Sequence, residues 1–156
     1  ERTDGPTCLA LSRQNLPPQP RDPEQLALIA RGGYVLLDTI PGKIDAIVIA
    51  TGSEVELAVQ GARQAAAAGV AVRVVSMPCC EAFDAQSADY RDAVLPRAVR
   101  KRLAVEAARS DYWRKYVGLD GEVIGIDSFG ASAPDKALYA HFGLTAERVA
   151  AALSAL

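Results

Sequence analysis

A strand, helix and strand pattern over residues 46–76 constrains the fold of this chain more than any other feature of its sequence. Two short apolar runs, "AIVIAT" and "AVRVVS", predict buried strands on either side of a helical segment. We expect Ser53 to cap this helix and Glu56 to complete a capping box. The helix should run to about Ala68, and Gly69 should end it. A crossover of this kind joins parallel strands, so the pattern indicates an α/β fold with a right-handed connection.

The alternation of strands and helices continues along the rest of the chain. Apolar runs predict strands over residues 7–12, 34–37, 46–51, 71–76, 102–107 and 122–127. Several of these runs are apolar at consecutive positions, which suits strands that are covered on both faces. The sequence therefore predicts a three-layer α/β/α sandwich with a mostly parallel central sheet of about five strands.

Two helices are expected toward the C-terminus. One should end at Phe142, before Gly143, and the other should begin after its cap at Thr145. We assign residues 1–20 to an edge strand and a Pro-rich connector. Residues 21–156 are expected to form a single α/β domain.

Length and charge limit the functions that this chain can have. Its 156 residues, of which 50% are hydrophobic, suffice for one globular domain with a buried core. A formal net charge of -2 argues against binding to nucleic acids or anionic membranes, because both need a basic surface. No apolar run approaches the roughly 20 residues that span a bilayer, and no secretory leader opens the chain. We therefore expect a cytoplasmic protein without a nucleic-acid or membrane partner.

The cysteines and the first residue carry two further expectations. Cys8, Cys79 and Cys80 are odd in number, and a disulfide between adjacent cysteines would be strained, which favours a reducing compartment. The chain opens at Glu1, and its single methionine, Met77, lies far inside the sequence. We therefore expect the chain to be part of a longer protein.

For several candidate sites the sequence favours a structural role. The segment "IATGSEVE" has a glycine between a strand and a helix, as in phosphate loops, but Glu54 and Glu56 in the first turn would repel an anion. His141 is the only histidine, which excludes a multi-histidine metal site and favours a contact with the end of its helix. Cys79 and Cys80 lack the neighbouring ligands of a metal site.

An aromatic cluster and one carboxylate are further candidates. Tyr112, Trp113 and Tyr116 favour core or interface packing over base stacking, because the chain is slightly acidic. Glu106 ends an apolar strand, where it is either a catalytic acid or a structural hydrogen-bond acceptor. No second acid or base stands at a recognisable spacing from Glu106, which favours the structural role.

The stretch "LALSRQNLPP" contains the remaining candidate, Arg13. An apolar run ends there in four polar residues, and two prolines then exclude further strand pairing. A guanidinium group binds phosphate or carboxylate through two parallel hydrogen bonds, and the end of a strand would hold it rigidly. The residues alone leave open whether Arg13 binds an anionic ligand or forms a loop-anchoring ion pair.

Several words of this sequence resemble, in order and spacing, the C-terminal domain of the transketolase family. They are "LSRQNLP", "ARGGYVL", "IATGSEVELAV", "VRVVSMP", "VEA" followed by "DYW" and "KYVG", and "FG" followed by "SAP". The resemblance covers essentially all 156 residues. It implies an enzyme of the pentose phosphate pathway that transfers a two-carbon ketol unit between sugar phosphates with thiamine diphosphate.

The resemblance implies one functional residue on this chain. Arg13 matches the arginine that, in the family, binds the phosphate at the far end of the sugar substrate. Thiamine diphosphate, a divalent metal (Mg²⁺ or Ca²⁺) and the catalytic residues belong to two preceding domains of the family. We therefore expect no catalytic, cofactor-binding or metal-binding residue here, and a chain that is inactive alone. The family also implies a homodimeric parent, with residues 1–20 leading in from the preceding domain.

Two alternative functions stay open at this point. The equivalent domain of a related thiamine-diphosphate enzyme, such as a deoxyxylulose-phosphate synthase or a 2-oxo-acid dehydrogenase subunit, would share the fold, although "SRQNLP" and "GGYVL" favour transketolase. A stand-alone assembly or regulatory module would also lack catalytic residues.

Overall fold

The crossover predicted over residues 46–76 is present in the computed structural model, which describes residues 5–156. β2 (Ala46–Ala50), α2 (Glu54–Ala67) and β3 (Val72–Ser76) follow one another along the chain, and the two strands pair in parallel. Every residue of β2 is buried. The parallel crossover is therefore confirmed.

Five strands form the central sheet, in the order β1-β3-β2-β4-β5. β4 (Arg102–Val105) pairs in parallel with β2, and β5 (Glu122–Ile124) pairs in parallel with β4. β1 (Tyr34–Asp38) lies at the opposite edge and is antiparallel to β3. The sheet is thus mostly parallel with one antiparallel edge strand, which confirms the predicted fold class.

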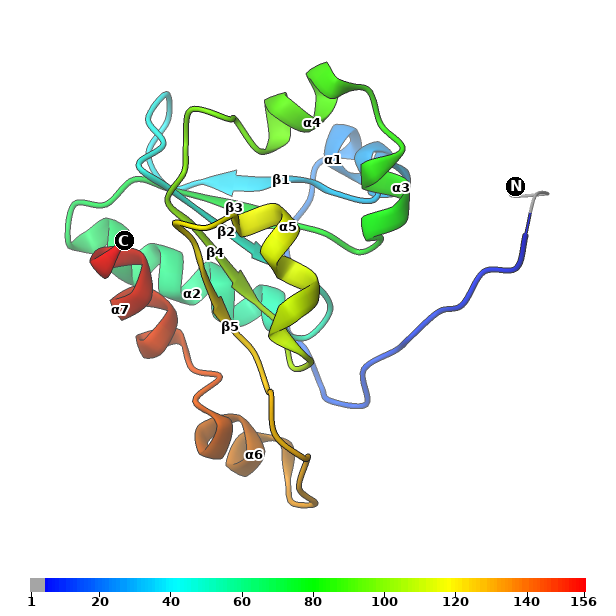
Figure 1. Ribbon diagram of the computed structural model, residues 1–156, viewed down its shortest axis with the longest axis vertical. Helices are drawn as coiled ribbons and strands as arrows, with labels where there is room; N and C mark the ends of the chain where they lie inside the picture. Colours follow the sequence, from blue (N-terminus) through cyan, green and yellow to red (C-terminus); the bar gives the residue numbers. More distant parts are fainter. Residues whose placement is uncertain (1–4) are drawn as a thin grey trace.

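Helices cover both faces of this sheet (Figure 1). The first face packs against α2 and α7 (Ala146–Ala155), and the second against α3 (Cys80–Asp84), α4 (Ala88–Val94) and α5 (Arg114–Val117). Successive side chains of a strand point to opposite faces, so Val48 enters the first core while Ile47 and Ile49 enter the second. These are the three layers that the sequence predicts.

The remaining helices are short. They are α1 (Pro23–Leu28), the 3-10 helices η1 (Ile29–Arg31) and η2 (Ser110–Trp113), and α6 (Asp135–Phe142). Gly143 follows α6, and the Thr145 hydroxyl caps α7 by accepting a hydrogen bond from the Arg148 amide at 3.2 Å, both as predicted. Within residues 5–156 no helix is both long and apolar enough to cross a bilayer.

α2 and α7 approach each other very closely. Gly61 of α2 faces α7, where an added Cβ would lie 2.6 Å from the Cβ of Val149 and 2.9 Å from the carbonyl oxygen of Ala146. Real Cβ atoms are not found this close to other heavy atoms, so only glycine permits this spacing of the two helices.

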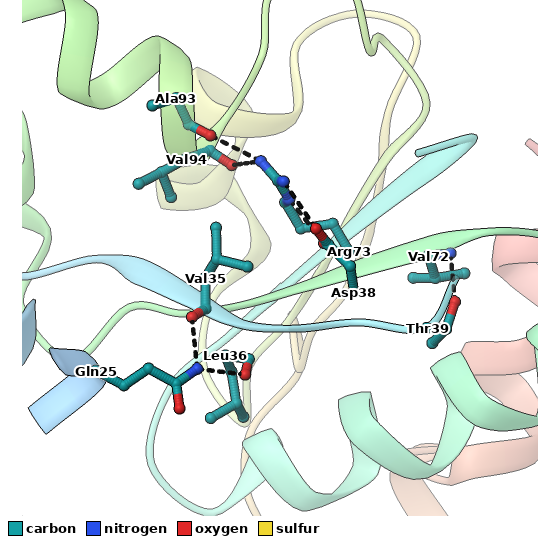
Figure 2. Close-up of polar contacts among 9 residues, drawn as sticks. All are labelled: Gln25, Val35, Leu36, Asp38, Thr39, Val72, Arg73, Ala93 and Val94. Atoms are coloured by element: carbon teal, nitrogen blue, oxygen red, sulfur yellow. Dashed lines mark hydrogen bonds and ion pairs between the residues drawn. The ribbon is translucent and has the colours of Figure 1, made fainter. Parts of the chain in front are cut away.

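Side-chain hydrogen bonds fasten the edge strand β1 to the rest of the domain (Figure 2). Arg73 of β3 donates from Nε and Nη2 to the two carboxylate oxygens of Asp38, at 2.8 and 2.9 Å. Its Nη1 donates to the carbonyl of Ala93 in α4 at 2.7 Å. On the other side, Gln25 of α1 donates to the carbonyl of Leu36 at 2.7 Å. β1 therefore has side-chain partners from both of its flanks in addition to its ladder with β3.

The strand expected over residues 7–12 is absent. These residues have no regular secondary structure, and Leu9 and Leu11 are 79% and 84% exposed. Figure 1 shows the segment, in dark blue, extending away from the sheet. An apolar alternation favours a strand, but a strand also needs a neighbour, and neither edge strand of this sheet pairs with the segment. Residues 1–4 of the expected connector lie outside the described residues.

Candidate functional site

The carboxyl ends of β2, β3 and β4 meet at one edge of the sheet. The connection after β2 leads to α2 on the first face, whereas the connection after β4 leads to η2 and α5 on the second face. In open α/β sheets, ligands bind at such a point, where successive connections diverge. The N-terminal segment borders this edge, since Leu16 and Pro17 line a cavity of about 410 Å³ together with Gly52 and Ser53.

Arg13 lies next to this edge, in a cavity of its own. The cavity measures about 680 Å³, and its walls come from the N-terminal segment and from α6, including Gln14, Asp135 and Tyr139. The Arg13 side chain is exposed. No hydrogen bond or ion pair joins it to any residue between 5 and 156, so the loop-anchoring ion pair is not observed within this range.

A chain of hydrogen bonds links the neighbour of Arg13 to the core of the domain. Gln14 Nε2 donates to the hydroxyl of Tyr139 at 3.1 Å, and this hydroxyl donates to Glu54 Oε1 at 2.5 Å. Ser53 Oγ donates to the same oxygen at 2.8 Å. Glu54 is 3% exposed. Burial, and then the hydrogen bond to Glu54, raise the pKa of Tyr139 to about 12, so its hydroxyl remains protonated at neutral pH.

The capping box predicted at Ser53 is wrong. Ser53 has helical backbone angles (φ -65, ψ -26) and makes no side-chain capping bond. A residue with these angles is already part of the helical turn, so its hydroxyl donates to Glu54 instead. The Glu56 carboxylate accepts a hydrogen bond from the side chain of Gln19, and so it contacts the N-terminal segment rather than Ser53.

Glu106 lies at the same edge of the sheet, after β4. It is partly buried and lines a cavity of about 530 Å³ together with Cys8, Thr51 and Cys79. Burial, and then the negative charge of Glu54, raise the pKa of Glu106 to about 7. The two carboxylates therefore repel each other above this pH.

We expect the burial of Glu106, together with this repulsion, to make folding stability fall as the pH rises. Folding raises the pKa of Glu106 from 4.5 to about 7. Between these two pH values the folded chain therefore holds a proton at Glu106 that the unfolded chain has lost. The free energy of unfolding is then highest near the lower pH and falls as the pH rises to about 7. Glu106→Gln should raise the free energy of unfolding at pH 8 by about 1–3 kcal/mol, allowing for screening by solvent. Urea unfolding between pH 5 and 8 measures this. The exposed Glu122→Gln is the control, and an unchanged pH slope in Glu106→Gln would contradict the assignment.

The aromatic cluster and His141, the other candidates from the sequence, pack mainly against neighbouring side chains. Trp113 and Tyr116 are 3% and 5% exposed in the second core, whereas Tyr112 is 47% exposed. The ring of His141 packs against that of Phe142 at the end of α6, with 4.8 Å between the ring centroids.

The three cysteines are not joined by disulfides. The thiols of Cys8, Cys79 and Cys80 are free, and burial raises the pKa of Cys80. Between residues 5 and 156 no group of three or more His, Cys, Asp or Glu side chains is placed to hold a metal ion.

The hydrogen bonds among Gln14, Tyr139 and Glu54 are the part of this site that sequence reasoning missed. Gln14 and Tyr139 are separated by 125 positions in the chain, so no local pattern relates them. A weak signal was present at Glu54, because a carboxylate next to the end of a buried strand needs a hydrogen-bond donor when it is buried.

This chain is similar in sequence to known transketolases. The model of the family described as "Transketolase-like TK C-terminal domain" matches residues 32–145. The chain is 58% identical to transketolase 1 of Escherichia coli over an alignment of 151 residues. This alignment covers 97% of this chain and 23% of that protein. It is also 58% identical to transketolase 2 of Vibrio parahaemolyticus over an alignment of 149 residues, which covers 96% of this chain and 22% of that protein. The chain thus spans less than a quarter of the length of these curated relatives.

Solved structures show the same fold. Transketolase from Leishmania mexicana matches with a TM-score of 0.79 and 43% identity, over 89% of this chain and 19% of that chain. Transketolase in complex with sedoheptulose-7-phosphate, from Pichia stipitis, matches with a TM-score of 0.79 and 36% identity, over 92% of this chain and 20% of that chain.

Proposed function

This chain belongs to the transketolase C-terminal domain family, and from this we propose that it is one domain of an enzyme that transfers a two-carbon ketol unit between sugar phosphates. We further propose that the parent enzyme is a cytoplasmic homodimer that uses thiamine diphosphate and a divalent metal, Mg²⁺ or Ca²⁺. The proposal is supported by relatives that are named transketolases and of which this chain spans 22 to 23%.

The described residues of this chain do not fit a thiamine diphosphate or metal site. Residues 5–156 contain no group of side chains that could hold a metal ion. Glu54 and Glu56 occupy the first turn of α2, near the carboxyl ends of the parallel strands. Their negative charges would repel a diphosphate there. We therefore assign the cofactor and the catalytic groups to domains that precede this one.

The role that we propose for this domain is to bind the phosphate of the substrate through Arg13. The observation that carries this role is an exposed guanidinium group, without a hydrogen-bond or ion-pair partner among residues 5–156, beside a cavity of about 680 Å³. A guanidinium group binds phosphate through two charge-assisted hydrogen bonds. The relative from Pichia stipitis was solved with a sugar phosphate, which agrees with such a substrate.

Binding at Arg13 would assist catalysis without any proton transfer by this residue. A phosphate held far from the reacting carbonyl contributes binding energy that orients the substrate for reaction. Arginine keeps its proton at all physiological pH values, so it cannot be a general base.

We also propose that residues 1–20 connect this domain to the domain before it. The exposed Leu9 and Leu11 support this, because apolar side chains at alternate positions suit a strand that pairs outside this sheet. The Pro-rich residues 16–20 would then separate that strand from α1.

The chain of 156 residues should unfold cooperatively but should neither bind thiamine diphosphate nor transfer a ketol unit. The reason is that it has a complete two-sided core and no described metal or diphosphate site. Calorimetric titration with thiamine diphosphate and Mg²⁺, and an assay with a ketose phosphate donor, measure both. The full-length enzyme from the same gene is the positive control. Micromolar cofactor binding by the 156-residue chain, or no ketol transfer by the full-length enzyme, would refute the proposal.

A further inference from the structure

We propose that Tyr139 is a positioning residue for Arg13, because its hydroxyl ties the segment that carries Arg13 to a buried carboxylate of the core. The inference rests on the phosphate-binding role proposed for Arg13. It adds a residue of α6 to that site, 126 positions away in the sequence, and assigns to it an effect on one class of substrates only.

The fixed end of this tie is Glu54. Its side chain is 3% exposed at the start of α2, a helix of 14 residues that packs against the sheet and α7. Glu54 Oε1 accepts hydrogen bonds from Tyr139 at 2.5 Å and from Ser53 at 2.8 Å. Hydrogen bonds to a charged acceptor are stronger than those between neutral groups, so the Tyr139 hydroxyl has a well-defined place.

The movable end of the tie is the segment around Arg13. The bond from Gln14 Nε2 to Tyr139, at 3.1 Å, is the only hydrogen bond or ion pair that joins residues 7–18 to the rest of the described chain. The neighbours Ser12, Arg13 and Asn15 are all exposed. An extended segment without such a bond keeps its backbone freedom, and each residue that is ordered costs about 1–2 kcal/mol. Fixing Gln14 therefore reduces the entropy that a phosphate ligand must overcome at Arg13.

Tyr139 also lies at the right place to influence the ligand. Arg13, Gln14 and Tyr139 line the same cavity of about 680 Å³, together with Asp135 of α6. The Tyr139 hydroxyl accepts from Gln14 and donates to Glu54 at the same time. A phenylalanine would keep the ring packed against the first core but could make neither bond.

The test compares Tyr139→Phe with wild type in the full-length enzyme. We expect kcat/KM for a phosphorylated donor to fall about 3- to 10-fold, mainly through a higher KM, because one neutral and one charge-assisted hydrogen bond are lost. A donor without the phosphate should react as before. Gln14→Met, which removes the donor at the other end, should give a loss of the same size, and combining the two changes should add little. Tyr112→Phe is the matched control, since its hydroxyl accepts a hydrogen bond from Lys115 at 3.4 Å and is not part of the cavity that Arg13 lines.

A second measurement separates the tie from the role of Arg13. In the 156-residue chain, NMR relaxation should show lower backbone order for residues 12–15 in Tyr139→Phe than in wild type. Unchanged order, or an unchanged kcat/KM for the phosphorylated donor, would overturn the positioning role. Failure of the proposed function has a different signature, because Arg13→Ala would then lower kcat/KM equally for donors with and without phosphate. If Tyr139→Phe still lowers kcat/KM when Arg13 is already alanine, Tyr139 acts through something other than Arg13.

Discussion

Arg13→Ala in the full-length enzyme should lower kcat/KM for phosphorylated donors about 10- to 100-fold. The change removes a pair of charge-assisted hydrogen bonds to the phosphate, worth about 1.5–3 kcal/mol. Because each 1.36 kcal/mol is about tenfold in rate, this loss gives the expected range. Stability should hardly change, since the side chain is exposed and has no partner between residues 5 and 156. Steady-state kinetics with matched phosphorylated and unphosphorylated donors measure the effect.

Arg13→Lys and the unphosphorylated donor are the controls for this result. Lysine keeps the charge but lacks the planar fork that binds two phosphate oxygens, so it should recover only part of the loss. A donor without the phosphate never makes the contact and should be affected far less. Equal losses on both donors would show that Arg13 supports the fold or a domain interface, and the phosphate-binding role would be withdrawn.

Gly32→Ala should lower the free energy of unfolding by about 3–5 kcal/mol, the largest stability effect that we expect in this domain. Gly32 has a φ of 84°, which is unfavourable for any residue with a Cβ atom. An added Cβ would also overlap the carbonyl oxygen of Cys79 and would lie 2.5 Å from the backbone nitrogen of Phe83. Since backbone atoms cannot rotate away, η1 and α3 would have to separate. Chemical denaturation and thermal unfolding measure the loss, which should lower Tm by about 10 °C.

Gly42→Ala separates the two causes of this loss. Gly42 also has a positive φ, of 75°, but nothing lies within 4 Å of a Cβ added there. Gly42→Ala should therefore lower the free energy of unfolding by only about 1–2 kcal/mol, the cost of the backbone conformation alone. Similar losses for the two variants would mean that the contact between η1 and α3 yields easily, contrary to what the structure indicates.

The sheet could be predicted from the sequence because its strands are buried on both faces. A residue such as Val48 lies in the first core and its neighbour Ile49 in the second, which requires the continuous apolar run that identifies β2. Residues 7–12 have a similar run, but their pairing partner does not lie in the described sheet. An apolar run shows that a segment can form a strand, but the segment does so only where a neighbouring strand is available for pairing.

The short helices on the second face were harder to predict. α3 has 5 residues and begins after Cys79, which makes no side-chain capping bond, so no start signal precedes it. α4 does have a cap, since Ser87 accepts a hydrogen bond from the Tyr90 amide at 3.2 Å, but its 7 residues are too few for a clear apolar period.

The candidate site was predictable only in part, for a different reason. Arg13 could be singled out because its family resemblance is carried by adjacent residues. The bond between Gln14 and Tyr139 depends on the placement of α6 beside the N-terminal segment, which no local pattern contains. The role assigned to Ser53 failed because a sequence spacing does not fix backbone angles.

The close contact between Gly61 of α2 and Val149 of α7 has a consequence for the folding of this chain during its synthesis on the ribosome. A ribosome that adds about 5–20 residues per second needs roughly 4–18 s to proceed from the first residue to the second. For that time the apolar face of α2 has been synthesised, but the helix that covers it has not. Nascent chains therefore expose this face to chaperones for seconds before the first core can close.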